Sequence, residues 1–465
     1  MRGTIRNLLG KPQLVFLIIA GTFCILSAVL MPILEVPDEN RDFQIAYAIF
    51  SSHKHAANDS VLSRDLVLNE DLVLRQIRNN NYRQYFLHKT SAKDDGIAIN
   101  TGSYVFDGKT KASAFNVMYL PQAIGILLGR LIYPSLGVMV VFGRLATVAL
   151  YLAAMYWIIK KVRYGKWALA FIASLPIVIQ QAASLSHDSV NLLAVFCWFA
   201  FIINLFARSK TAITWKDLAG GAVLAVFLLL TKANNVLLLA LVVGLPATYL
   251  TQINLYRRLR ESSLWRPVKY LSVPVAAAVA CAVVLVIFKV LLAGHPFHPH
   301  RLVDVLANTF IRGDKGDLTL IDATVTGMVG EFSNFYYHLP VWIVGVAFMV
   351  LLVIMLYEKL PNISRRFAAL SGSLFFVSIL LITIGMYYAW AMLPIRLGPN
   401  AAVADGIQGR YFTPLLVLLF PMFAYLQRYV KITAAKETTV PLVASVTSTF
   451  LLIIYIYQTW FFFWR

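Results

Sequence analysis

Acidic side chains crowd the segment EVPDENRDF, which directly follows the first long apolar stretch of the chain and contains Glu35, Asp38, Glu39 and Asp42. Mutual repulsion and partial loss of hydration at a membrane surface favour the protonated form of such groups, which suits one of them to accept a proton. An acidic exit that helps to set topology is the alternative, but acidic residues contribute little to topology. The segment is therefore the strongest candidate for a general base.

A second polar motif, DGIQGRYFTP, places Gln408, Arg410 and Tyr411 at the start of a late apolar stretch. A guanidinium can bind a phosphate through two parallel hydrogen bonds. An arginine on the outer surface gains nothing from the positive-inside rule, so its position favours a binding role. Snorkelling to lipid headgroups or pairing with a carboxylate is the alternative.

Two short turns add further ionisable groups, His187 and Asp188 in SLSHDS and Lys232 in TKANN. Such groups between apolar segments are functional candidates, with salt bridges between helices as the competing role. Ser186, His187 and Asp188 do not form a catalytic triad, because neighbours on one turn point in different directions. Arg144, inside the second apolar stretch, either snorkels outward or faces a polar cavity.

The elements that position these groups are membrane helices. A chain of 465 residues with 59% hydrophobic and 14% charged residues cannot cover its apolar surface as a soluble domain does. We expect an all-α, polytopic, single domain over residues 1–465 with about eleven spans. The spans are 14–34, 137–159, 167–184, 190–206, 218–230, 235–251, 268–292, 341–357, 367–387, 411–426 and 441–461.

The net charge of +19 would suggest nucleic acid in a soluble protein. Here the basic residues gather in alternate loops, which is the positive-inside pattern and excludes nucleic acid as the partner. The pattern predicts a cytoplasmic N-terminus and an outer C-terminus. The polar chemistry then falls in three outer loops, residues 35–136, 294–339 and 388–410.

Two segments of the first outer loop allow alternatives. Residues 116–132 are apolar enough for a full span, but Pro121 and Arg130 favour an interfacial or re-entrant helix. Residues 61–78 place Leu62, Leu66, Val73 and Ile77 near one helical face. That helix docks on the membrane interface or packs on the loop's own core.

Several familiar motifs are missing from the sequence. It has no phosphate-binding P-loop, no GxGxxG fingerprint and no HExxH motif, which argues against an ATP-driven pump, a dinucleotide enzyme and a zincin protease. The histidines of HPFHPH alternate with prolines and make a weak metal site, so we assign no metal ligands. The energy for any reaction must come with the substrate.

Several of these motifs together resemble a known family. The PDE motif at Asp38 and Glu39, the long first loop, the GRL sequence around Arg144 and the QGRYF motif at Arg410 resemble bacterial membrane proteins of the domain-of-unknown-function 2142 group. The resemblance covers nearly the whole chain. These proteins in turn look like GT-C glycosyltransferases, polytopic enzymes that use polyprenyl-phosphate sugars. The chain departs from the family pattern at Val36 and Asp42, where the family has a proline and a histidine.

The resemblance implies roles for the candidate residues. A first-loop carboxylate of GT-C enzymes serves as base or sometimes as metal ligand, so Asp38 is the preferred base and Glu39 the second choice, and a divalent cation stays open. Arg410 and Lys232 would neutralise the departing polyprenyl phosphate. The remaining substrate-binding candidates are Asp42, Arg144, Asp188, Gln408 and Tyr411.

The expected reaction is an inverting sugar transfer from a polyprenyl-phosphate donor to a surface polysaccharide or lipid-linked glycan, such as O-antigen or cell-wall glycan. It would take place on the extracytoplasmic face of the bacterial inner membrane. A flippase or transporter of lipid-linked sugars would line its path with the same charges. A polysaccharide polymerase is a third possibility.

Overall fold

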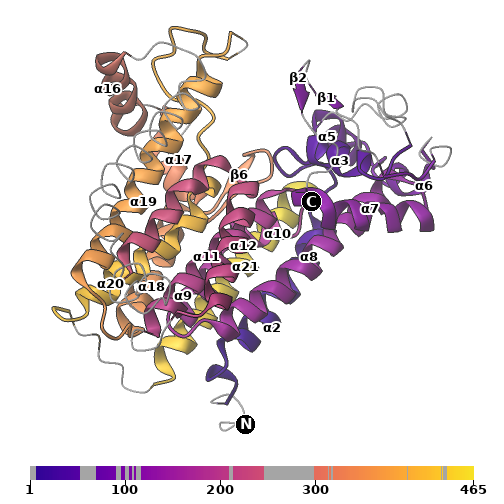
Figure 1. Ribbon diagram of the computed structural model, residues 1–465. Helices are drawn as coiled ribbons and strands as arrows, with labels where there is room; N and C mark the ends of the chain where they lie inside the picture. The colour runs from indigo at the N-terminus through magenta and orange to yellow at the C-terminus, as the bar shows by residue number, and fades with distance from the viewer. Residues whose placement is uncertain are drawn as a thin grey trace, which may run out of the picture.

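The computed structural model is mostly helical, and the helices run side by side between two ends of the molecule (Figure 1). It describes residues 7–52, 70–90, 96–99, 104–106, 109–111, 117–208, 213–245, 298–312, 314–315, 318–394, 396–430, 432 and 437–465. The predicted span 268–292 lies outside the described residues, as do residues 61–69 of the predicted first-loop helix.

Five of the described helices are long and apolar enough to cross a membrane. Side chains set the start of two of them, since Ser135 Oγ accepts from Val138 N at 3.4 Å and Ser364 Oγ accepts from Phe367 N at 3.1 Å. The five overlap predicted spans. They are α2 (Pro12–Leu30), α8 (Leu136–Lys161), α11 (Asp188–Ala207), α19 (Arg365–Met386) with η5 (Tyr387–Ala391), and α21 (Thr439–Trp464).

The third predicted span, 167–184, is not one continuous helix. It consists of α9 (Lys166–Ala173) and α10 (Pro176–Ala182), because Pro176 has no N–H to continue the helical hydrogen bonds. Other predicted spans are also short or irregular in the structure. They correspond to α12 (Trp215–Thr231), the 3₁₀ helix η3 (Ala233–Gly244), α18 (Val341–Tyr357), and η7 (Thr413–Leu418) with α20 (Leu419–Leu426).

Loops predicted to be cytoplasmic meet at the lower end of the bundle in Figure 1, where the N-terminus also lies. Arg163 N donates to Asn204 Oδ1 at 2.8 Å, and Tyr357 Oη donates to the Glu437 carbonyl at 3.2 Å. Glu358 joins them by accepting from the N-terminus of α9. The described basic loops therefore share one end, as the alternation of charge predicts, whereas the predicted cytoplasmic loop between spans 235–251 and 268–292 lies outside the described residues. The membrane side that this end faces stays a prediction.

The described parts of the first loop gather at the upper end (Figure 1). Val73 of α5 is buried against a small core that includes Phe43 and Ile126, so this helix packs on the loop's own core. The elements are α3 (Glu39–Ala48), α5 (Glu70–Arg78), α6 (Gln84–Leu87), the antiparallel pair β1 (Tyr104–Phe106) and β2 (Lys109–Lys111), η2 (Val117–Tyr119) and α7 (Leu120–Ile132).

Helix α7 has 13 residues, fewer than the roughly 20 that a bilayer requires. It packs closely on α8 because Gly125 has no side chain. A Cβ there would lie 2.3 Å from the Phe142 carbonyl oxygen. A short helix held against the end of α8 agrees with the interfacial or re-entrant interpretation rather than with a full span.

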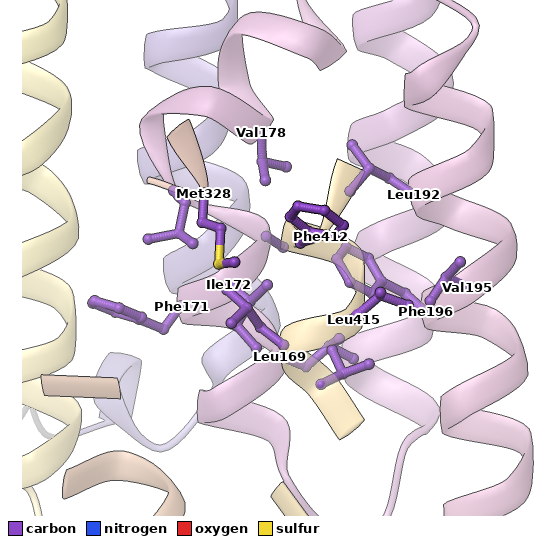
Figure 2. Packing of buried hydrophobic residues seen from close by; sticks show 14 of the residues in the cluster. Leu169, Phe171, Ile172, Val178, Leu192, Val195, Phe196, Met328, Phe412 and Leu415 are labelled. Carbon is purple, nitrogen blue, oxygen red and sulfur yellow. The ribbon is translucent and has the colours of Figure 1, made fainter. Parts of the chain in front are cut away.

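The later loops also reach the upper end. Their elements are α16 (Pro299–Ala307), η4 (Asn308–Arg312), the pair β3 (Asp314–Lys315) and β4 (Leu318–Thr319), α17 (Leu320–Gly327), the pair β5 (Glu331–Phe332) and β6 (Tyr337–His338), and η6 (Gly409–Tyr411). Phe412, directly after η6, is fully buried among Val178, Leu192 and Phe196 in the main core (Figure 2). This packing fixes the backbone that carries Arg410.

Candidate functional site

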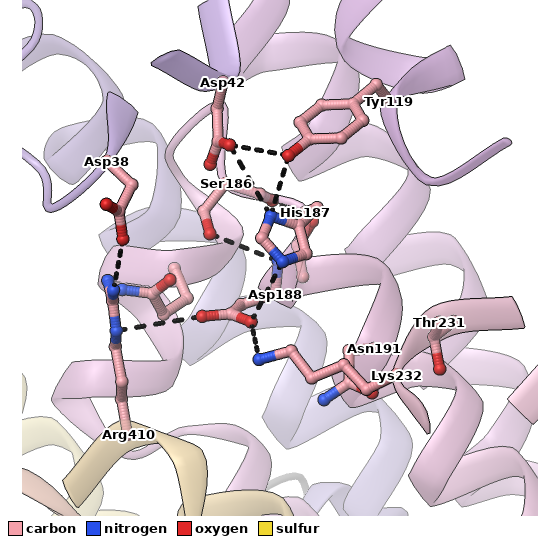
Figure 3. Close-up of polar contacts among 12 residues, drawn as sticks. Asp38, Asp42, Tyr119, Ser186, His187, Asp188, Asn191, Thr231, Lys232 and Arg410 are labelled. Atoms are coloured by element: carbon pink, nitrogen blue, oxygen red, sulfur yellow. Dashed lines mark hydrogen bonds and ion pairs between the residues drawn. The ribbon is translucent and has the colours of Figure 1, made fainter. Parts of the chain in front are cut away.

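Four charged side chains meet at the upper end of the bundle and form what we call the ion cluster: Asp38, Asp188, Lys232 and Arg410 (Figure 3). The Lys232 Nζ forms an ion pair with the Asp188 carboxylate. Arg410 Nη2 donates to Asp38 Oδ2 at 2.9 Å, and Arg410 Nε lies 3.8 Å from Asp188 Oδ2. All four were predicted from the sequence, and the fold brings them together from segments far apart in the chain.

Breaks between helices position the members of the ion cluster. Asp188 is the first residue of α11, and Lys232 occupies the joint between α12 and η3. Asn235 Nδ2 ties this joint to α11 by donating to Asn191 Oδ1 at 2.7 Å. The side chain of Lys232 is thereby held beside Asp188.

The glycine of the QGRYF motif places Arg410 by allowing a close approach of two backbones. A Cβ at Gly409 would lie 2.2 Å from the Thr324 carbonyl oxygen and 2.4 Å from the Met328 nitrogen. Any other residue would push η6 away from α17. The motif therefore needs glycine at this position to bring Arg410 into the site.

Asp38 stands in a left-handed backbone conformation with φ 65°. Aspartate and asparagine tolerate this region better than other residues that have a side chain. The Asp38 side chain is 53% exposed, whereas that of Arg410 is 5% exposed. Asp38 is thus the open member of the ion cluster.

Arg410 has donors left over. Among the described residues its buried Nε and Nη1 have no hydrogen-bond partner, since the 3.8 Å to Asp188 is too long for a hydrogen bond. Burial acts to lower the pKa of the Arg410 guanidinium, but nearby Tyr411, Asp188 and Asp38 raise it above its ordinary value. The side chain is therefore a cation with unused donors, a pattern that in native structures calls for an explanation such as a missing ligand.

A small, partly open pocket adjoins these donors. Arg410, Lys232 and Asp188 contribute its charges, and Asn191 and Gln181 contribute amides. The amide oxygen and nitrogen of Gln181 are buried and have no hydrogen-bond partner within the described part of the chain. Gln181 was not predicted as a site residue, although a pair of glutamines inside an apolar stretch indicates a polar site.

One aromatic and one amide side chain of the QGRYF motif, Tyr411 and Gln408, lie next to the ion cluster. The Tyr411 ring centroid lies 5.0 Å from Lys232 Nζ and 5.5 Å from Arg410 Cζ, so the ring faces both cations. Gln408 Oε1 is buried without a hydrogen-bond partner among the described residues. Both predicted residues thus lie beside Arg410.

Glu39 and Arg144 form a separate, fully buried ion pair. Arg144 Nε donates to Glu39 Oε1 at 2.8 Å, and its Nη2 donates to Glu39 Oε2 at 2.5 Å. Three further bonds reach the carbonyls of Ala28, Met31 and Pro32 at the end of α2. All five donors of Arg144 are used, which leaves none for a substrate. The sequence predicted Glu39 as the second choice of base and Arg144 as a substrate-binding residue, whereas their contacts indicate a structural role.

Asp42 takes part in a second polar group next to the ion cluster. Tyr119 Oη donates to Asp42 Oδ1 at 2.7 Å and lies 3.0 Å from His187 Nδ1 (Figure 3). Tyr119 was not singled out in the sequence, because a tyrosine before an apolar helix is typical of an interface. His187 was considered only with its neighbours in the turn.

Metal binding has no support in the described residues, where no group of three or more histidine, cysteine or acidic side chains is arranged to hold an ion. His295 of the HPFHPH segment lies outside the described residues. The described site offers charged side chains, amides and the group of Asp42, Tyr119 and His187.

The fold and the apolar helices define a helical membrane protein with a polar site at one end of its bundle. The chain belongs to the family described as predicted membrane protein (DUF2142), whose profile matches residues 22–419. No curated protein and no solved structure matches the chain. The matched segment includes all four residues of the ion cluster.

Proposed function

We propose that this protein is a membrane glycosyltransferase that takes a sugar from a polyprenyl-phosphate donor. The observation that carries the proposal is the buried, charged Arg410 with unused donors beside Lys232 and a pocket. Two cations that converge on one pocket suit a phosphate, and Arg410 can bind it with two parallel hydrogen bonds. An exposed carboxylate, Asp38, stands within hydrogen-bond distance of the same guanidinium.

The charges of the ion cluster suggest how a donor enters. Two carboxylates balance two cations, so a phosphate must compete with one of the carboxylates for Arg410 or Lys232. Asp38 is the weaker competitor, because it is half exposed and a single hydrogen bond joins it to Arg410. Donor binding would release Asp38 beside the sugar, while the buried Asp188 keeps Lys232 in place.

In the proposed reaction the released Asp38 accepts the proton of an acceptor hydroxyl. The hydroxyl oxygen bonds to the anomeric carbon, and the bond from that carbon to the phosphate oxygen breaks. Arg410 and Lys232 stabilise the negative charge that develops on the departing lipid phosphate. Direct attack inverts the anomeric centre. Gln408, Tyr411 and Asp188 shape the binding site around the two cations.

The site is on the end of the bundle opposite the described basic loops, which under the positive-inside rule supports an extracytoplasmic site. The acceptor would be a surface polysaccharide or lipid-linked glycan of a bacterial inner membrane.

Glu39 is unsuited to the role of base, because it is fully buried and forms an ion pair with Arg144.

Asp38→Asn tests the proposal. Asparagine keeps the shape and tolerates the left-handed backbone of Asp38, so the variant should accumulate normally and lose sugar transfer in isolated membranes. Removal of a general base typically lowers the rate roughly 10²- to 10⁴-fold. Asp304→Asn, on the exposed face of α16, is the matched control and should keep full activity. Full activity of Asp38→Asn would remove Asp38 from the mechanism.

A further inference from the structure

The hydrogen bonds among Asp42, Tyr119 and His187 determine which nitrogen of the imidazole carries a proton. Tyr119 has one hydroxyl proton, and it is donated to the Asp42 carboxylate at 2.7 Å. The Tyr119 oxygen can then only accept from His187 Nδ1 at 3.0 Å. His187 therefore carries a proton on Nδ1, and Nε2 is the nitrogen that gains or loses one.

The Nε2 of His187 points toward the ion cluster. It lies 3.9 Å from Asp188 Oδ1, and the side chain is 29% exposed (Figure 3). Ser186 helps to hold the turn, since its Oγ accepts from Asp188 N at 3.2 Å. Tyr119, bonded to the buried Asp42, thus orients the imidazole from one side through Nδ1, while Nε2 faces Asp188 of the ion cluster.

The charges around His187 balance when the ring is protonated. The groups that face it are Asp42 from α3, Tyr119 from η2 and Asp188 from α11, and Lys232 and Arg410 contact Asp188 from the far side. Together with Asp38 these are three carboxylates against two permanent cations. An imidazolium supplies the third positive charge.

We propose that His187 donates its Nε2 proton to the departing phosphate, with Tyr119 and Asp42 as positioning residues. The inference rests on the proposed sugar transfer. Breaking the bond between the anomeric carbon and the phosphate oxygen turns a singly charged diester into a monoester that can bind a second proton, with a pKa of about 6. The acceptor hydroxyl proton goes to Asp38, the His187 proton goes to the lipid phosphate, and exchange with water restores both residues.

His187→Gln tests the proton transfer in purified full-length protein supplied with synthetic prenyl-phosphate hexoses. We expect kcat to fall roughly 10²- to 10⁴-fold. The loss of rate toward alkaline pH that accompanies deprotonation of an imidazole should also disappear. His338→Gln is the matched control, because His338 is exposed on β6 and bonds within its own strand end. It should leave both kcat and the pH profile unchanged.

Tyr119→Phe provides a milder variant if His187→Gln does not fold. It removes only the hydroxyl that orients the ring, so kcat should fall and the alkaline limb should move, with little change in KM for the donor. Wild-type kcat and an unchanged pH profile in either variant would overturn the role of His187.

Binding of prenyl phosphate, the expected product, separates this inference from the transferase proposal, because it requires no turnover. Wild-type protein should bind prenyl phosphate more tightly than His187→Gln does, because the bound phosphate accepts a hydrogen bond from His187 Nε2. Equal affinity of the two proteins would overturn the inference. Absence of transfer from any donor by the wild type would instead contradict the proposed function.

Discussion

At the scale of residues, two buried arginines differ in how many of their hydrogen-bond donors have partners. Arg144 uses all five donors on Glu39 and on the end of α2. Arg410 is nearly as buried, yet its Nη2 donates to the exposed Asp38, and its Nε and Nη1 have no hydrogen-bond partner among the described residues. A fully satisfied arginine holds a fold together, whereas one with free donors beside a pocket is available to a ligand.

The same substitution should therefore lower stability at Arg144 and weaken donor kinetics at Arg410. Arg144→Gln leaves the buried Glu39 without its cation, which should cost about 3–5 kcal/mol of stability and lower the amount of folded protein. Arg410→Gln should leave the thermal stability close to the wild type. It should reduce kcat/KM for the prenyl-phosphate donor roughly 10- to 150-fold, the loss expected from a hydrogen bond to a charged group.

Thermal unfolding and donor kinetics on the two purified variants measure both effects. Unchanged donor kinetics in a folded Arg410→Gln protein would exclude Arg410 from phosphate binding. A stable, folded Arg144→Gln protein would contradict the structural role of Arg144.

The sequence identifies each member of the ion cluster as a candidate, because each is a charged residue next to an apolar stretch, but it leaves open whether these residues bind a ligand or pair with one another. The same reasoning cannot tell Arg144 from Arg410. Their difference depends on which carbonyls and carboxylates lie within reach, and that is set by packing between α2, α3 and α8. Tyr119 was missed for the same reason, since its partners Asp42 and His187 come from distant segments.

At the scale of elements, the joint between α9 and α18 has its own titratable group. Glu358, just after α18, accepts from Trp167 N at 3.0 Å and from Ala168 N at 2.8 Å at the start of α9. Burial of the carboxyl raises its pKa to about 7, although these hydrogen bonds act to lower it. The folded protein therefore binds a proton more tightly at Glu358 than the unfolded chain does.

This difference predicts how stability depends on pH. Between the ordinary value of 4.5 and about 7 the folded state holds more protons at Glu358, so its contribution to stability falls as the pH rises through that window. Glu358→Gln should remove this fall in the unfolding temperature measured from pH 5 to 8. Glu437→Gln, an exposed residue at the same end, should keep it. The same slope in Glu358→Gln and wild type would contradict the assignment.

Apolar length predicts the elements only in part. It locates the five long helices, because their length and hydropathy are properties of the sequence alone. It fails for 167–184, where hydropathy runs on through the break at Pro176. The break at Lys232 agrees with the prediction, because the predicted spans 218–230 and 235–251 lie on either side of it. The break between α10 and α11 positions Asp188, and the break between α12 and η3 positions Lys232, so the site depends on the joints between helices.

At the scale of the whole molecule, the two ends of the bundle differ in kind. The basic loops meet at the end near the N-terminus, and the ion cluster lies at the opposite end with the described parts of the first loop. The C-terminal end of α21 also lies there, since Trp464 Nε1 donates to the Leu30 carbonyl at 2.7 Å. Under the predicted topology most of the net charge of +19 lies in cytoplasmic loops, and the proposed function rests on a few charges at the other end.

The most direct test of the central claim supplies purified protein in detergent with radiolabelled prenyl-phosphate hexoses and a lipid-linked glycan acceptor, without any membrane gradient. The account predicts covalent transfer of the sugar to the acceptor by the wild type and none by Asp38→Asn. Elongation by whole repeat units would indicate a polymerase instead. No covalent product from the wild type, together with movement of the lipid-linked sugar across reconstituted vesicles, would contradict the account and identify a carrier.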